Sequence, residues 1–356
     1  KREDIRINGE YYISLSYKIL LEQKKNIYIY PIQHFMQWGT PEDLKDYQNW
    51  SSIFDNLCKK KKYDDEFKVK GSSIIPMAGL GKRFSNEGYK KTKPLISVSG
   101  KPMVLQAVND LPESKCTTFV IRKDMKEYKY IKNIIKSNYS NSLVLTLDKV
   151  TSGQAITALE GLDYMEKMKG LVTEPLTIGA CDNGCIYNSK KLNELMNNSD
   201  IDIIVWGKKN HSHAMRNPEM YGWINADANG RIKEVKVKKP ISNELKEPII
   251  IGTFTFSKAY EFRKLVNALI SKEMKVNQEY YIDSCINLAI EMGLSCFYFE
   301  VDSFISWGTP NDFKTFEYWQ SCFHKWNWHP YSLEKDSRVD PKAISELNNK
   351  YNEFDK

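Results

Sequence analysis

The sequence predicts an α/β fold, in which a mostly parallel (mixed) sheet is covered by helices on both faces. Short apolar runs of strand length alternate with stretches in which apolar residues recur every three or four positions, and this alternation is typical of strands joined by helical crossovers. Glycine and proline residues separate many of the runs. Strands are expected at residues 72–76, 117–122, 142–147, 176–180, 201–207 and 296–301, and helices at 103–111, 128–137, 155–168, 189–197, 260–272 and 282–292.

The composition indicates a globular protein without membrane spans. The 356 residues are 41% hydrophobic, enough to bury one large core or two modest ones. No apolar run reaches the roughly twenty residues that a membrane span requires, and the charged beginning is unlike a signal peptide. The seven cysteines are scattered and form no Cys-x-x-Cys pair, which predicts reduced thiols and a cytoplasmic location.

The net charge of +7 comes mostly from lysines spread along the chain, with one dense run at residues 59–62. A solvated linker explains that run, because no nucleic-acid-binding motif accompanies it. The remaining excess fits an enzyme whose substrates and products are polyanions.

The stretch from residue 73 to residue 103 carries the chemistry. A strand-like run is followed by a loop that contains Gly79 and Gly81, and then by an arginine and several lysines. Glycines allow backbone N–H groups to approach a polyphosphate closely, and the cations add charge recognition. The spacing fits neither the P-loop nor the dinucleotide-binding fingerprint. The stretch therefore predicts a different kind of nucleoside triphosphate site.

The compound pattern Gly-x-Gly-x-Arg, followed by Lys-Pro-Leu, is formed here by Gly79, Gly81, Arg83 and residues 93–95. It resembles the signature of the sugar-phosphate nucleotidyltransferases. Within this family the chain looks like a nucleoside-diphosphate-sugar pyrophosphorylase of the capsule type. The resemblance implies a Rossmann-like nucleotidyltransferase fold of the GT-A-like kind. It assigns catalysis to Arg83 and Lys93, and nucleotide binding to Ala78, Gly79, Leu80 and Gly81.

Gln154 lies in a Gly-Gln-Ala turn that leads into a predicted helix. In the resembling family such a turn helps to read the nucleobase, and a carboxamide offers the donor and the acceptor that a base edge requires. The other interpretation is a helix start capped by Thr151 or Ser152. Both can hold together.

Asp182 follows the apolar run 176–180, where a strand would end. The resemblance implies that an Asp at this place contacts the nucleotide through Mg²⁺. Magnesium binds few protein carboxylates and takes its other ligands from substrate and water, so one Asp is a sufficient anchor. The alternative is that Asp182-Asn183-Gly184 is a simple turn.

The resemblance also implies a set of acceptor-binding residues. The family's Glu-Lys-Pro stretch has its lysine at the substrate phosphate, but here Lys238 and Lys239 share that place and no Glu directly precedes them. Gly252 matches the glycine that lets the sugar lie close to the backbone. Asn277 and Glu279 are candidates for hydroxyl or amine groups, or else they form a structural entry to a helix.

The clearest departure from the family is Ser306, which replaces a second metal-binding Asp before Gly-Thr-Pro. Either Asp302 substitutes for it, or the metal rests on Asp182 and phosphate oxygens. His211 and His213 lack a nearby third ligand in the sequence and indicate a polar loop instead of a metal site.

The chain contains an internal repeat, because residues 8–54 align without a gap on residues 277–323. We expect residues 1–58 to be the C-terminal remnant of a preceding nucleotidyltransferase-like repeat, cut inside that unit, or else an accessory layer docked on the intact domain. Residues 59–70 are then a linker, residues 71–323 the nucleotidyltransferase domain, and residues 324–356 a tail with a helix.

The predicted reaction transfers a nucleoside monophosphate from an NTP to a phosphorylated sugar or similar small phosphomonoester and releases pyrophosphate. The resemblance adds Mg²⁺ as cofactor, a role in capsule or surface-glycan precursor synthesis, and a homo-oligomer as one arrangement. Two alternatives stay open: a nucleotide-sugar-dependent glycosyltransferase of related fold, and a unit that binds nucleotide without turnover. The base and the acceptor are not determined by the sequence.

Overall fold

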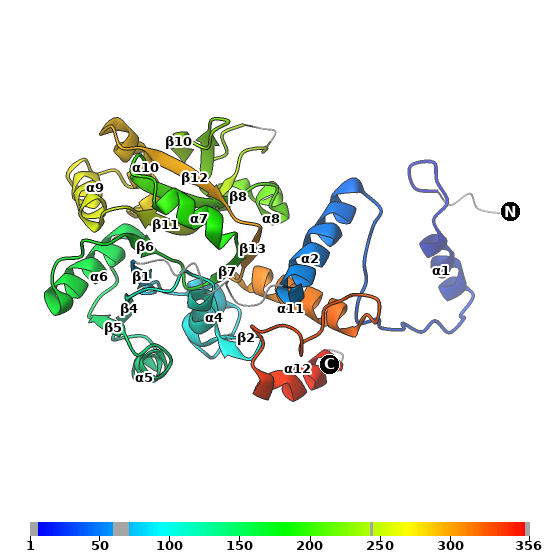
Figure 1. Ribbon diagram of the computed structural model, residues 1–356. Helices are drawn as coiled ribbons and strands as arrows, with labels where there is room; N and C mark the ends of the chain where they lie inside the picture. Colours follow the sequence, from blue (N-terminus) through cyan, green and yellow to red (C-terminus); the bar gives the residue numbers. More distant parts are fainter. Residues whose placement is uncertain (1–5, 60–70, 243–244, 353–356) are drawn as a thin grey trace.

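The computed structural model describes residues 6–59, 71–242 and 245–352. The predicted linker therefore lies, except for residue 59, outside the described residues. The core of the molecule is a nine-stranded sheet (Figure 1). Its main path runs β10 (Ile232–Lys236), β9 (Trp223–Ala226), β11 (Ile249–Phe256), β6 (Leu176–Ile178), β1 (Ser72–Pro76), β4 (Cys116–Arg122) and β5 (Ser142–Leu147), and β8 (Ile203–Lys208) and β12 (Cys296–Glu300) join through β11.

Strands β6, β1, β4 and β5 pair in parallel, as do β8 and β12, whereas β11 runs antiparallel to both β6 and β8. The prediction of a mostly parallel, mixed sheet is confirmed. Strand β11 was not predicted. Its apolar run is interrupted by Gly252, whose φ is +80°, and its pairing with β8 shifts register between Ile250 and Phe254, which is typical of a bulge.

Helices cover both faces of the sheet. Successive residues of a strand point to opposite faces, so neighbouring apolar residues of β1 pack against different helices. Ile74 belongs to the apolar cluster beneath α6 (Gln154–Lys169), α9 (Ala259–Ser271) and α10 (Ile282–Glu291). Its neighbour Ile75 belongs to the cluster beneath α4 (Met103–Asn109) and α5 (Tyr128–Asn138). On the β8–β11 side, the same second face is covered by α7 (Ser189–Met196) and α8 (Ser212–Arg216).

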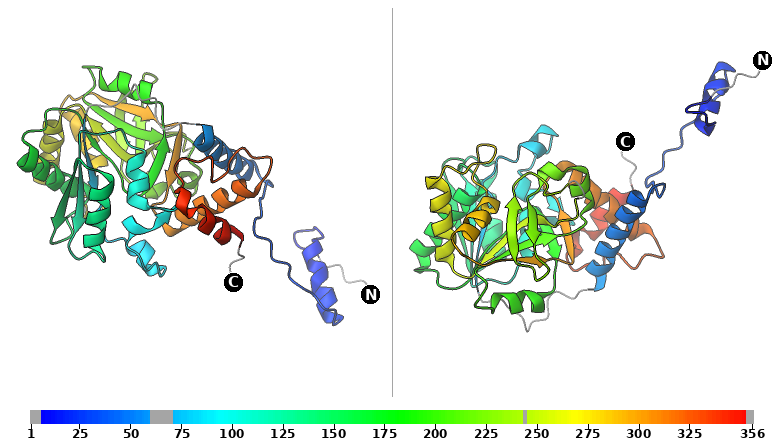
Figure 2. Two further views of the ribbon diagram at one scale, coloured as in Figure 1. Left: turned by 60° about the horizontal axis from the view of Figure 1, so that its bottom comes forward. Right: turned by 90° about the horizontal axis from the view of Figure 1, so that it is seen from above.

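A separate apolar cluster forms beside the sheet, around α11 (Pro310–Lys325). It joins α11 to α2 (Pro41–Lys59) and to the tail helix α12 (Ile344–Asn352), which lie together in Figure 2. Two small ribbons complete the structure: β7 (Asn183–Ile186) pairs with β13 (Ser303–Ser306), and β2 (Ser97–Val98) pairs with β3 (Lys101–Pro102).

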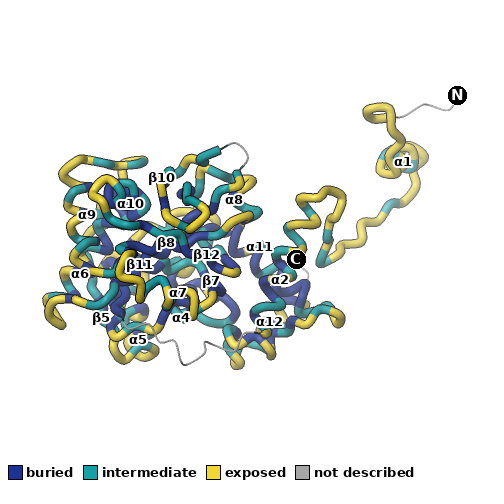
Figure 3. The backbone as a smooth tube through the Cα atoms, turned by 45° about the horizontal axis from the view of Figure 1, so that its top comes forward, coloured by how far each residue is buried: buried dark blue, intermediate teal, exposed yellow. Residues whose placement is uncertain are grey.

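The first part of the chain differs from this packing. Helix α1 (Ile13–Glu22) contains no buried residue, and it stands away from the body of the molecule at the end of an extended stretch (Figures 2 and 3). In contrast, α2 buries Trp50, Ile53, Phe54 and Leu57. Among the described residues, no helix has the length and apolar character needed to cross a bilayer.

Candidate active site

The glycine loop leaves β1 at Pro76 and ends at α3 (Lys82–Asn86), so it lies at the carboxyl edge of the parallel strands. Gly81 has a φ of +63°, a left-handed conformation that glycine adopts without strain. The loop is held from below by Arg122, at the end of β4, whose guanidinium donates to the carbonyl oxygen of Ala78 and to Asp124. The sequence analysis did not identify Arg122; an arginine that ends an otherwise apolar strand was the available signal.

Lys93 begins a 3₁₀ turn, η1 (Lys93–Leu95). Its Nζ lies 2.5 Å from Oδ2 of Asp182 and donates to the carbonyl oxygen of Gly308 at 2.9 Å. Burial alone would lower the pKa of Lys93, but the adjacent Asp182 carboxylate more than offsets it and the pKa is raised. Lys93 is therefore a partly buried cation, fixed by the Asp182 carboxylate and the Gly308 carbonyl oxygen.

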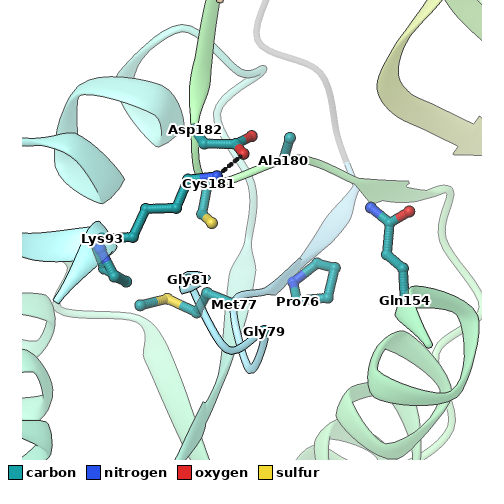
Figure 4. Close-up of a pocket in the computed structure, with 10 residues that line it drawn as sticks. Pro76, Met77, Gly79, Gly81, Lys93, Gln154, Ala180, Cys181 and Asp182 are labelled. Carbon is teal, nitrogen blue, oxygen red and sulfur yellow. Dashed lines mark hydrogen bonds and ion pairs between the residues drawn. The ribbon is translucent and has the colours of Figure 1, made fainter. Parts of the chain in front are cut away.

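These groups line one pocket of about 210 Å³, shown in Figure 4. The glycine loop forms its floor, and Lys93 and Asp182 meet on one side. Gln154 reaches in from the start of α6 on the other side. The lining residues are Pro76, Met77, Gly79, Gly81, Lys93, Pro94, Gln154, Ala180, Cys181 and Asp182.

Cys181 is the nucleophilic side chain in this pocket. Burial, together with the neighbouring Asp182, raises the pKa of its thiol to about 12, so the thiol stays protonated at neutral pH. It therefore acts as a small packing group and not as a nucleophile.

The turn that carries Gln154 is pinned to the segment that precedes α10. Ala155 N donates to the carbonyl oxygen of Tyr280, and Tyr280 N donates to that of Ser152. A Cβ on Gly153 would lie 2.5 Å from the Tyr280 backbone, so only glycine fits there. The predicted side-chain cap of α6 is wrong, because Gly153 is the N-cap and no side chain caps it.

A second polar group surrounds Lys238, whose Nζ donates to the carbonyl oxygen of Met220 and lies 5.9 Å from the Tyr281 ring centre. Burial lowers the pKa of Lys238, and Asp283 counteracts that shift. Asp283 was not identified in the sequence. Burial raises the pKa of Asp283 to about 6, against the opposing effect of Lys238. Gly222 lies so close to Asp283 that a Cβ on this glycine would collide with the Asp283 carboxylate.

Arg83 projects from α3 on the exposed side of the glycine loop. Its charge opposes the ionised form of both Lys93 and Lys238, and it lowers the pKa of Tyr281 against the larger effect of burial. Arg83 therefore acts electrostatically on both the pocket and the Lys238 group, although it does not line the pocket.

The other predicted residues divide into two sets. Gly252 lies beside the pocket wall, since a Cβ there would be 3.6 Å from Ala180, and Glu279 acts electrostatically on Lys238 and Tyr281. The remaining residues do not line the pocket: Ala78 is buried behind the loop, and Leu80, Lys239 and Asn277 are exposed.

Ser306 belongs to a polar chain that the sequence did not reveal. Its hydroxyl donates to Asp312 at 3.1 Å, and the other Asp312 oxygen lies 3.0 Å from Nδ1 of His213. The same nitrogen lies 2.8 Å from the Tyr221 hydroxyl. His213 is thus part of a hydrogen-bonded network, but it lies on helix α8 and not in the polar loop that was predicted. The Asp302 side chain belongs to an exposed turn before β13.

A divalent cation would find one carboxylate in the pocket. No cluster of three or more His, Cys, Asp or Glu side chains with metal-binding geometry occurs in the described part of the chain. Asp182 fits the requirement of a hard cation that takes most of its ligands from phosphate oxygens and water. Ser306 is close by, because a Cβ on Gly308 would lie 3.4 Å from Asp182 Oδ2 and 3.5 Å from Ser306 Oγ.

Comparison with known proteins agrees with this architecture. The sequence profile of the family described as "Nucleotidyl transferase" matches residues 72–319. In a comparison with curated proteins, no sequence matched the chain.

Several solved structures share the fold. The nucleoside-diphosphate-sugar pyrophosphorylase from Vibrio cholerae RC9 superposes with a TM-score of 0.57 at 18% identity, over 68% of this chain and 98% of that one. An apo UDP-glucose pyrophosphorylase gives 0.54 at 16% identity, over 72% and 99%. The inositol-1-phosphate CTP transferase from T. maritima gives 0.52 at 14% identity, over 70% and 95%.

At these identities the structural likeness establishes the fold, and the profile match over most of the chain establishes the family. The chain is a nucleotidyltransferase, a member of the nucleotidyl transferase family.

Proposed function

We propose that the protein transfers a nucleoside monophosphate from an NTP to a small phosphomonoester, such as a sugar phosphate, and releases pyrophosphate. The observation that carries this proposal is the pocket in which the glycine loop faces the Lys93–Asp182 pair. A partly buried lysine whose pKa is raised, placed beside the backbone amides of a glycine loop, is suited to a polyphosphate.

In this reaction an oxygen of the acceptor phosphate attacks the α-phosphorus of the NTP. A new P–O bond forms as the bond from the α-phosphorus to the bridging oxygen breaks, and pyrophosphate leaves with the electron pair. Such a displacement requires alignment and charge neutralisation and no covalent enzyme intermediate. Lys93 neutralises the α-phosphate and Arg83 the leaving β- and γ-phosphates.

The acceptor phosphate is assigned to Lys238. This lysine is half-buried beside Asp283 and is fixed by the Met220 carbonyl oxygen, whereas Lys239 is exposed. Gly252 provides close backbone approach next to Ala180, and Glu279 is available to hydroxyl or amine groups of the acceptor. Gln154, which lies across the pocket from Lys93 (Figure 4), is assigned to the nucleobase because its carboxamide offers both a donor and an acceptor.

Asp182 would hold Mg²⁺ when the NTP binds, and the ion would supply charge to the phosphate oxygens. Lys93 already occupies one oxygen of this carboxylate. Binding of a metal–nucleotide complex therefore requires Lys93 to share Asp182 or to move its ammonium group to the phosphate.

The glycosyltransferase alternative is less well supported. The one Asp-x-Asp of the sequence is Asp200-Ile201-Asp202, directly before β8. Because β8 runs in the same direction as β6, this motif lies at the opposite edge of the sheet from the pocket. Asp202 is also used structurally, since it accepts from Ser295 N at 2.8 Å.

The test is pyrophosphate release from each of the four NTPs, with a panel of phosphorylated sugars, amino alcohols and amides. We expect release only with one preferred NTP and an acceptor together. Transfer from a nucleotide sugar without pyrophosphate release would support a glycosyltransferase, and nucleotide binding without turnover would support a non-catalytic unit. Provision of precursors for capsule or another surface glycan, in the cytoplasm, is the role that we propose on resemblance to the family.

A further inference from the structure

The two copies of the internal repeat begin with the same local structure. An isolated antiparallel bridge joins Ile7 to Glu10 in the first copy and Val276 to Glu279 in the second. The helices that follow, α1 (Ile13–Glu22) and α10 (Ile282–Glu291), have equivalent bounds. The bridge and the helix that begin the first copy therefore match those that begin the second copy.

The polar contacts at the start of the next helix are also repeated. Thr40 Oγ1 accepts from Asp43 N at 3.2 Å, and Thr309 Oγ1 accepts from Asp312 N at 3.1 Å. The side chain preceding each Trp-Gly-Thr-Pro donates to the same acidic residue: Gln37 to Asp43, and Ser306 to Asp312, both at 3.1 Å.

Equivalent apolar side chains ahead of α2 and α11 differ in how far they are exposed. Ile13 is 85% exposed and its equivalent Ile282 is 0% exposed. Trp38 is 55% exposed and Trp307 is 1% exposed. In the second copy these side chains are covered by the nucleotidyltransferase core, because α10 packs with α9 and β10, and β12 pairs with β8.

The two copies meet through α2 and α11, and they do so symmetrically. Equivalent residues contact each other: Trp50 stacks on Trp319 at 6.5 Å and 18°, and Phe54 packs against Phe323 at 5.5 Å with the rings tilted by 48°. The reciprocal pairs are also present: Phe54 lies 5.6 Å from Phe316, and Tyr47 lies 6.1 Å from Phe323. This is the pattern of an isologous interface, in which i contacts j and j contacts i.

We propose that residues 6–38 are the closing segment of a second nucleotidyltransferase-fold unit, whose core precedes them in the same polypeptide and covers their exposed apolar face. That unit would be related to residues 71–325 by the local two-fold axis between α2 and α11. The proposal concerns assembly and does not depend on the proposed reaction.

The occupant is identified by the second copy, which shows what covers the same pattern of side chains. A separate copy of this chain is a poor occupant, because its core is already closed by its own residues 277–307. That segment is covalently attached and competes at high effective concentration. In the complete unit the core also precedes its closing segment in sequence.

The two segments differ where they would touch their cores. Asn287 on α10 bonds both the N–H and the carbonyl oxygen of Val235 at 2.7 Å, and its equivalent is Lys18. Ala289 is fully buried, and its equivalent is Leu20. The core of the other unit is therefore related to residues 71–276 but not identical to them.

The test is a chimera in which an additional copy of residues 71–276 is spliced ahead of Asn8 of the full chain, with Lys18→Asn and Leu20→Ala to match this core. We expect amide exchange in residues 13–22 and 27–30 to slow about a hundredfold or more relative to the chain 1–356. The matched control carries residues 71–325 ahead of residue 60, so that each core keeps its own closing segment.

Unchanged exchange in the adapted chimera, with the control folded, would overturn the proposal. So would a dimer of the chain 1–356 that protects α1, because the occupant would then be a second copy. An independent measurement is the intact mass of the endogenous protein, captured with an antibody against residues 71–352. We expect it to exceed 41.5 kDa by about 20 kDa or more, the mass of such a core; a mass of 41.5 kDa would contradict the proposal.

Discussion

The first and second copies of the repeat separate what local sequence decides from what packing decides. Both form the same bridge, the same helix and the same Thr-Pro helix start. Only the second forms strands: residues 296–300 and 303–306 are β12 and β13, whereas the equivalent residues 27–31 and 34–37 form no strand. Helices and caps depend on nearby residues, but a strand requires a partner.

The two copies also differ in what they contribute to the pocket. The carbonyl oxygen of Gly308 in the second copy holds Lys93 in the pocket, while the equivalent Gly39 has only the side chain of Gln37 near it. The same Trp-Gly-Thr-Pro sequence therefore supports the candidate active site in one place and forms a surface turn in the other. Matched substitutions in the two copies can break or sharpen this comparison.

The largest difference in stability is expected for Trp307→Ala against Trp38→Ala. Trp307 is fully buried beside Phe316, and removal of such a side chain costs about 3–5 kcal/mol. Trp38 is mostly exposed, so its removal should change the free energy of unfolding by about 0.5 kcal/mol or less. Urea unfolding of both variants measures this, and equal losses would contradict the burial difference.

The next largest effect is expected on turnover, for substitution of Lys93, which the carbonyl oxygen of Gly308 in the second copy holds in place. Lys93→Ala should lower pyrophosphate release about a hundredfold or more, because a preorganised charge at the α-phosphate is lost. Arg83→Ala should have a similar effect at the leaving phosphates. Far-ultraviolet circular dichroism is the control for folding, and near-normal turnover in either variant would refute the role assigned to it.

Asp283 has Ser14 as its equivalent in the first copy, and it gives a prediction for pH. Its native pKa of about 6 lies above the ordinary value of 3.8, so the folded state binds the proton more tightly than the unfolded chain. Stability from this group is therefore full at low pH and is lost as the pH rises toward 6. Relative to the wild type, Asp283→Asn should become more stable by about 2 kcal/mol between about pH 4 and pH 6.5.

Chemical denaturation of both proteins across this range measures the difference. Asp110, another buried carboxyl with a pKa near 6, is present in both and cancels. A gap between the two proteins that stays constant with pH would show that Asp283 is ionised in the native state throughout.

The smallest effect is expected for Asp312→Asn against Asp43→Asn. Asp312 connects Ser306 to His213, so its neutralisation should loosen the Gly308 turn and lower turnover about tenfold. Asp43 is partly exposed and accepts a hydrogen bond from Gln37, and its replacement should leave turnover unchanged. Steady-state kinetics on the two variants decides, and an equal loss in both would point to a general effect on folding.

Much of the fold was predictable because its signals are local. The apolar run 72–76, the glycines after it and the helix that begins at Gln154 all have short-range causes. Lys93, Gln154 and Asp182 could be named because their motifs resemble those of a known family, and the structure places them around one pocket.

The rest could not be predicted because it depends on distant partners. The contact of Arg122 with the glycine loop is visible only once β4 lies beside β1, and Asp283 is distinctive only once Lys238 lies near it. The link from Ser306 to Tyr221 joins residues from three separate segments. Nothing in the sequence of α1 indicates that it would be exposed, since its apolar pattern is that of a packed helix.

The close approach of Gly153 to the Tyr280 backbone has a consequence for how specificity can change. The turn that presents Gln154 and the segment that leads to Glu279 are one rigid frame, hydrogen-bonded in both directions. Exchanging the Gln154 side chain would retune donor choice without disturbing the frame. Inserting one residue between Asn277 and Tyr280 would misalign the donor and acceptor walls together, so this lineage can diversify by replacement here but not by changes in length.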